Sequence, residues 1–163
     1  MITHDKLTEA VRHVVHDYAN LVSSGTMAVQ GHHLGKGFDS PVNAHIGDAF
    51  LANCRKMYEF FKYKPKKGYI RAKDFVPGVD YKLPNWGSWH GHMSKQLMHV
   101  TIDRVDNQRV WKGHNENKLF LEEFKRAWKK FLCNLEKTHK SRFNSEISER
   151  LKSAFKGLDL GLE

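Results

Sequence analysis

Several features that define other classes of protein are missing from this chain of 163 residues. No apolar run approaches the roughly 18 residues needed to span a bilayer, so we expect no membrane segment. The chain has two cysteines, Cys54 and Cys133, and no CxxC motif. Both are predicted to be reduced core residues of a cytoplasmic protein. Charges and histidines run through the N-terminal segment, which argues against a signal peptide.

The short motifs of several enzyme classes are also missing. The sequence contains no GxSxG, no GxxxxGK[ST] and no HExxH, and neither cysteine has a histidine neighbour that suggests a catalytic pair. We therefore predict no cofactor and no metal site. Because zinc enzymes take several histidine ligands, a metal-dependent bundle enzyme stays open as an alternative. Its candidate ligands are His13, His16, His32, His33, His90 and His92.

Positive charge is in excess. The formal net charge is +9, and a basic balance favours nucleic acid or another polyanion as a partner. The stretch FKYKPKKGYIRAK (residues 61–73) has no acidic residue, and Tyr63 and Tyr69 lie among its cations. Such a pattern can pair with phosphates and stack on bases. The predicted phosphate ligands in it are Lys62, Lys64, Lys66, Lys67, Arg71 and Lys73.

Helical periodicity dominates the chain. Apolar residues recur at helical spacing after Thr3, and Ser23-Ser24-Gly25 is expected to end that first helix. Further helices are predicted over residues 41–63, 88–105, 115–135 and 144–155, with Trp86 and Trp89 packing the start of the third. Long irregular loops are expected at about 25–40 and 64–86. The whole chain, 1–163, is predicted to be one all-α domain, a four- to five-helix bundle.

The stretch MSKQLMHVTIDR, which ends at Arg104, carries the candidate catalytic histidine. His99 lies outside the apolar arc of this predicted helix and shares a polar face with Lys95, so it is placed to meet solvent or a ligand. Arg104 lies inside the apolar arc and needs a carboxylate partner, for which Asp48 and Glu59 are the candidates.

Three motifs in order resemble a known family. They are FLANCRKMYEFF with Arg55 and Glu59, then RAKDF, then SKQLMHVTIDR with His99 and Arg104. Together they cover residues 43–105 and resemble small bacterial helical proteins related to the HEPN superfamily (higher eukaryote and prokaryote nucleotide-binding). The sequence has Asn53 where the second helix of that family carries a histidine.

The resemblance implies a HEPN-like fold, a homodimer and the cleavage of RNA without metal, in a ribonuclease toxin or defence component with an antitoxin-type protein partner. His99 would then be the acid–base group, while Lys95, Arg104 and Arg55 would serve the phosphate. The sequence thus predicts an RNA- or nucleotide-engaging protein. The first alternative is a non-catalytic binding module that uses residues 61–73.

Overall fold

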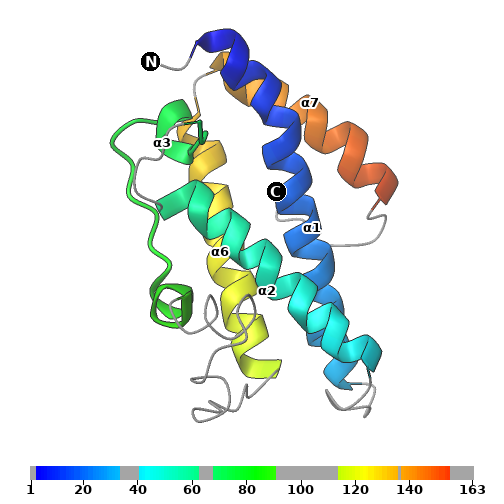
Figure 1. Cartoon of the computed structure of the whole chain (residues 1–163). Helices are drawn as coiled ribbons and strands as arrows, with labels where there is room; N and C mark the ends of the chain where they lie inside the picture. Colours follow the sequence, from blue (N-terminus) through cyan, green and yellow to red (C-terminus); the bar gives the residue numbers. More distant parts are fainter. Residues whose placement is uncertain (1–2, 34–40, 63–67, 91–113, 136, 155–163) are drawn as a thin grey trace.

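Four long helices form most of the computed structural model, which describes residues 3–33, 41–62, 68–90, 114–135 and 137–154, and the first and last of them run opposite to the two between. They are α1 (His4–His33), α2 (Pro41–Lys62), α6 (His114–Asn134) and α7 (Lys137–Ala154) (Figure 1). The short helix α3 (Ala72–Phe75) and a helical segment over residues 84–90 lie between α2 and α6 in sequence. The described residues contain no strand, so the predicted all-α bundle is confirmed. Among these residues, no helix is long and apolar enough to cross a bilayer.

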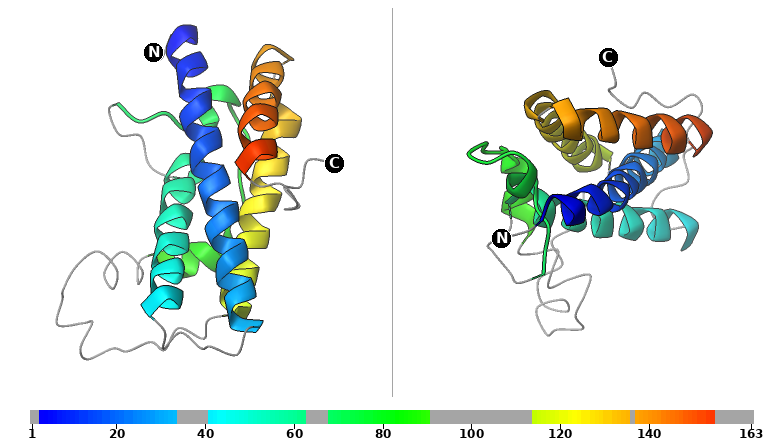
Figure 2. Two further views of the ribbon diagram at one scale, coloured as in Figure 1. Left: turned by 90° about the vertical axis from the view of Figure 1, so that its right-hand side faces the viewer. Right: turned by 90° about the horizontal axis from the view of Figure 1, so that it is seen from above.

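The long helix α1 packs against α2, α6 and α7, and Figure 2 shows it between α2 and α7. Its predicted apolar stripe is buried as expected, including Val11, Val15, Tyr18 and Leu21. A helix that contacts three others buries a wide arc of its surface. This burial stabilises α1 beyond Ser23-Ser24-Gly25, where the sequence predicted its end, and the helix continues to His33.

The predicted loop over residues 25–40 is wrong for residues 25–33, which belong to α1. Gly25 lies inside α1, at a point where side chains of α2 and α6 approach its backbone closely. A Cβ atom placed there would be 2.7 Å from Cε2 of Phe50 and 3.0 Å from Cδ1 of Leu121. The glycine thus serves packing between α1, α2 and α6, and burial of Ala28 beyond it continues the apolar stripe.

Aromatic rings fill the core around α6. The predicted stripe of this helix is fully confirmed as buried, from Phe120 to Leu135. Phe131 lies 5.3 Å from Phe60, 5.2 Å from Phe143 and 5.5 Å from Trp128, centroid to centroid. Most of these pairs are edge-to-face, the geometry that aromatic quadrupoles prefer. One residue of α6 therefore joins α2 and α7.

Three smaller predictions need correction. The last helix, α7, begins at Lys137 and not near Asn144, because His139 and Phe143 are buried and supply two further turns of contact. The third predicted helix begins at residue 84 and not 88. Cys133 is exposed while Cys54 is buried, because Cys133 is about 200° around α6 from Phe131.

Gly25→Ala tests whether α1 depends on its close approach to α2. Alanine normally stabilises a helix interior, but here the added methyl would force Phe50 or Leu121 to move. We expect the free energy of unfolding to fall by about 1–3 kcal/mol, as for an overpacked core. Urea titration followed by circular dichroism measures it.

Gly87→Ala is the matched control, because a Cβ at this exposed helical position would meet nothing within 4 Å. For Gly87→Ala we expect the free energy of unfolding to rise by up to about 1 kcal/mol, because alanine has the higher helix propensity. Equal effects of the two substitutions would contradict the packing role of Gly25.

Candidate nucleic-acid interface

His99, Lys95 and Arg104 lie outside the described residues, and so do Lys64, Lys66 and Lys67 of the basic stretch. The remaining predicted phosphate ligands are described, and they do not converge on one point. Their positions are best understood from the carboxylates beside them.

Arg55 and Glu59 form an ion pair on the partly exposed face of α2, with 3.2 Å between Nε of Arg55 and Oε1 of Glu59. The predicted polar face of this helix, with Asp48 also exposed, is confirmed. His90 packs on Tyr58 nearby, 4.5 Å between ring centroids. Burial, and then the Arg55 guanidinium, lower the pKa of His90 below its usual value, against the opposing effect of Glu59. His90 is therefore held towards its neutral form.

Arg71 is engaged by Asp74 at the start of α3. The Asp74 carboxylate accepts a hydrogen bond from the Arg71 backbone N–H at 2.8 Å and lies 3.3 Å from its guanidinium. The Arg71 side chain is only 13% exposed. These contacts stabilise the first turn of α3 and leave little of the guanidinium exposed, whereas Lys73 is exposed.

Three exposed lysines from separate segments lie at or near Asp80, whose carboxylate is also exposed. Lys62, the last residue of α2, forms a hydrogen-bonded ion pair with it, and Lys130 of α6 donates to the Asp80 backbone carbonyl at 2.8 Å. The pKa of Asp80 is lowered, first by its hydrogen bond to Lys62 and the charge of that lysine, and then by Lys130 and Lys82. We call Lys62, Lys82 and Lys130 the lysine cluster.

The lysine cluster holds three cations beside one carboxylate. Sequence reasoning identified Lys62 but missed Lys82 and Lys130, because Lys130 lies 50 positions after Asp80 and no local pattern links the two. The chain leaves α2 at Lys62, and the next five residues, YKPKK, include three more lysines. Lys62 thus belongs both to the lysine cluster and to the basic stretch.

The helical segment over residues 84–90 is anchored by a buried glutamate. Glu123 of α6 is 1% exposed, and its carboxylate accepts hydrogen bonds from the backbone N–H groups of Asn85 (2.8 Å) and Trp86 (3.0 Å). It also accepts one from the Asn85 side chain at 2.7 Å. Pro84 begins the segment with no N–H of its own, so the carboxylate satisfies the next two donors. Trp86 is buried, which confirms its predicted packing role.

Glu123 also affects the buried thiol beside it. Cys54 is fully enclosed, and burial raises its pKa well above the usual value, with a further contribution from the Glu123 charge. Since the thiolate is the reactive form, Cys54 is an inert core residue. This agrees with the reduced core role predicted from its neighbours.

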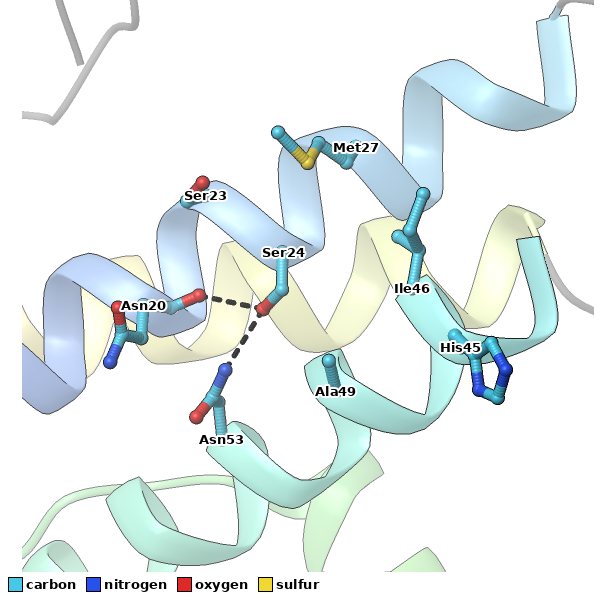
Figure 3. Close-up of a pocket in the computed structure, with 8 residues that line it drawn as sticks. All are labelled: Asn20, Ser23, Ser24, Met27, His45, Ile46, Ala49 and Asn53. Atoms are coloured by element: carbon cyan, nitrogen blue, oxygen red, sulfur yellow. Dashed lines mark hydrogen bonds between the residues drawn. The ribbon is translucent and has the colours of Figure 1, made fainter. Parts of the chain in front are cut away.

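Two grooves lie along the junction of α1 and α2. One, of about 420 Å³, is lined by Ser23, Ser24 and Met27 of α1 opposite His45 and Asn53 of α2 (Figure 3). Ser24 Oγ donates to the Asn20 carbonyl at 2.6 Å and accepts from Asn53 Nδ2 at 3.2 Å. These polar groups satisfy one another, and the groove contains no lysine or arginine, so it lacks the character of a phosphate site.

The second groove, of about 440 Å³, lies between α1, α2 and residues 68–70. Asp17, Lys56 and Glu59 are charged residues of its lining, and Tyr69 of the basic stretch is at its edge. It therefore adjoins the predicted nucleic-acid stretch, whereas the groove of Figure 3 does not share a residue with it.

Within the described ranges, no group of three or more histidine, cysteine, aspartate or glutamate residues is arranged to hold a metal ion. The side chains of His32, His33 and His92 lie outside this description.

No protein-family model, curated protein or solved structure matches the chain.

Replacing Glu123 by glutamine tests the anchor of segment 84–90. The amide keeps the shape but has one acceptor oxygen and turns a donor towards buried N–H groups. We expect the free energy of unfolding to fall by about 2–4 kcal/mol, since hydrogen bonds to a charged group are lost and a buried donor is left unpaired. Urea unfolding measures the loss.

Glu122→Gln is the control. This neighbour is 48% exposed and forms only a 3.7 Å pair with Lys125, so we expect a change within about 0.5 kcal/mol. A Glu123→Gln protein as stable as the control would show that the anchor contributes little.

Proposed function

We propose that this chain binds RNA, with the lysine cluster at the end of α2 as part of the phosphate-binding surface. The observation that carries the proposal is that exposed Lys62 and Lys130, from two different helices, both contact Asp80, one at its carboxylate and one at its backbone carbonyl, with exposed Lys82 two residues further along the chain. Ammonium groups in excess over carboxylates at an exposed site attract phosphates and release the counterions bound to them.

The sequence supports the same location. Three lysines and Tyr63 follow directly after Lys62, and Tyr69, which is 48% exposed, follows within the same basic stretch. Single-stranded nucleic acid is bound by this combination of cations along the backbone and aromatic side chains under the bases. A non-catalytic binding module and a ribonuclease both need such a surface.

Asp80 has a specific place in this proposal, because it competes with phosphate for the same lysines. Its lowered pKa keeps it charged throughout the neutral range, so the competition does not change with pH there. Binding of RNA must displace or share the contacts of Lys62 and Lys130 with Asp80.

Substituting alanine for Lys62, Lys82 and Lys130 together should weaken RNA binding and its dependence on salt. With about 0.7 counterions released per phosphate contact on a single strand, the slope of log K against log salt should become shallower by about two. Fluorescence anisotropy of a labelled single-stranded RNA, measured over a salt series, gives both quantities.

The matched control replaces Lys6, Lys118 and Lys140, which are exposed on α1, α6 and α7, and removes the same total charge. It should keep most of the affinity. Asp80→Asn provides the opposite change, because it frees the cluster, and should tighten binding. Equal losses in the cluster and control triples would reduce the effect to net charge and overturn the proposed surface.

The resemblance to HEPN-related proteins adds RNA cleavage to the proposal, with His99 as the acid–base group. A histidine that titrates near neutrality can move protons to and from the 2′-hydroxyl and the leaving oxygen. The homodimer and the antitoxin-type protein partner implied by the same resemblance also stay predictions.

The purified chain and His99→Ala, incubated with structured and single-stranded RNAs in the presence and absence of EDTA, test this part. We expect cleavage by the unaltered chain that resists EDTA and is reduced by about a hundredfold or more in the variant, the range for loss of an acid–base group. Circular dichroism checks that both chains are equally helical. Binding without cleavage would leave the non-catalytic alternative.

A further inference from the structure

The groove between α1, α2 and residues 68–70 has an apolar floor and a charged rim. Val14, Met57 and Phe60 are buried beneath it and Ile70 is half-buried beside them. Its volume of about 440 Å³ is within the range of small-molecule sites. An apolar floor with a few polar groups at the edge suits a flat, heteroaromatic ligand.

Tyr69 gives the groove an aromatic edge. The chain turns at Gly68, whose φ of +89° is in the left-handed region that favours glycine, and Tyr69 follows at once. The tyrosine lines the groove and is 48% exposed. An aromatic ring at this position, in the middle of the basic stretch, can stack on a base.

Lys56 and Asp17 lie at the rim of the groove, where the lysine offers a hydrogen-bond donor and the aspartate an acceptor. Nζ of Lys56 lies 3.6 Å from Oδ1 of Asp17, and their side chains are 56% and 36% exposed. The other rim carboxylate, Glu59, accepts from Arg55 and is more enclosed. Asp17 is thus the carboxylate with more freedom to meet a ligand.

We propose that this groove binds a guanine base of the RNA, an inference that rests on the RNA binding proposed above. The Watson–Crick edge of guanine has an acceptor, O6, followed by two donors, N1–H and the N2 amino group. The Lys56 ammonium complements O6, and the two oxygens of Asp17 accept from the two donors. Proteins read single-stranded RNA through such edges while aromatic side chains stack on the base.

The other bases match this rim less well. Adenine and cytosine have one amino group beside a ring acceptor, and uracil has one N–H between two carbonyls, so none offers two adjacent donors to one carboxylate. A site whose carboxylate is left half-paired discriminates against the ligand that lacks the donor. The groove is therefore a guanine site within a surface that otherwise binds phosphate without regard to sequence.

The test uses the full chain and labelled oligouridylates of about nine nucleotides, within the usual site size for single strands. One RNA is uridine throughout, and the others have a single central guanosine or adenosine. We expect the guanosine to tighten binding by about tenfold or more over uridine, and adenosine to have a smaller effect.

Asp17→Asn should bring the guanosine and uridine RNAs to within about twofold of each other, because the amide turns a donor towards N1–H or N2. Asp5→Asn, the same change at an exposed position of α1 outside the groove, should keep the guanosine preference. Tyr69→Ala should weaken the guanosine RNA by about tenfold, while circular dichroism stays unchanged.

The outcomes separate the two proposals. Oligouridylate that binds through the lysine cluster with no gain from guanosine would overturn the guanine site and leave RNA binding intact. A guanosine preference that survives in Asp17→Asn would also overturn it. If none of these RNAs binds the unaltered chain, the RNA-binding proposal fails and the guanine site fails with it.

Discussion

One buried carboxylate determines how the middle of this chain joins the bundle. Glu123 sits within α6 among aromatic side chains, where an unpaired charge would be costly, and its partners are the donors at the start of segment 84–90. The segment also depends on Glu123, because these N–H groups have no other acceptor among the described contacts. The interaction fixes segment 84–90 against α6.

Several cations of the predicted phosphate-binding and groove residues are paired with carboxylates. Arg71 is directed inward by Asp74, Arg55 pairs with Glu59, and Lys56 pairs with Asp17. Net charge and linear clustering of cations therefore overstate what is free to meet a polyanion. The lysine cluster differs because, among the described contacts, only Lys62 of its three cations pairs with a carboxylate, and all three residues are exposed. The chemistry of the surface depends on this local surplus.

The sequence predicted the helices of this bundle better than their ends. The stripe from Phe120 to Leu135 was correct because burial on one side repeats every turn, and this repetition is visible in the sequence. Gly25 was misread because glycine favours helix ends in general, and only the neighbouring Phe50 ring shows that it serves close packing. The partners of Glu123 and the contact of Lys130 with Asp80 could not be predicted, because they join segments far apart in sequence. Lys62 was the one cluster residue that a local pattern identified.

The central place of α1 has a consequence for synthesis on the ribosome. This helix is made before every element that covers it, and its partners α6 and α7 follow more than 80 residues later. At about 5–20 residues per second, α1 waits for several seconds or longer with part of its apolar stripe uncovered. Pairing with α2 can cover one side early, as a hairpin of adjacent helices, but Tyr18 cannot stack on Trp128 until α6 has emerged. The nascent chain consequently passes through a stage in which an α1–α2 hairpin exposes apolar surface and is open to chaperones.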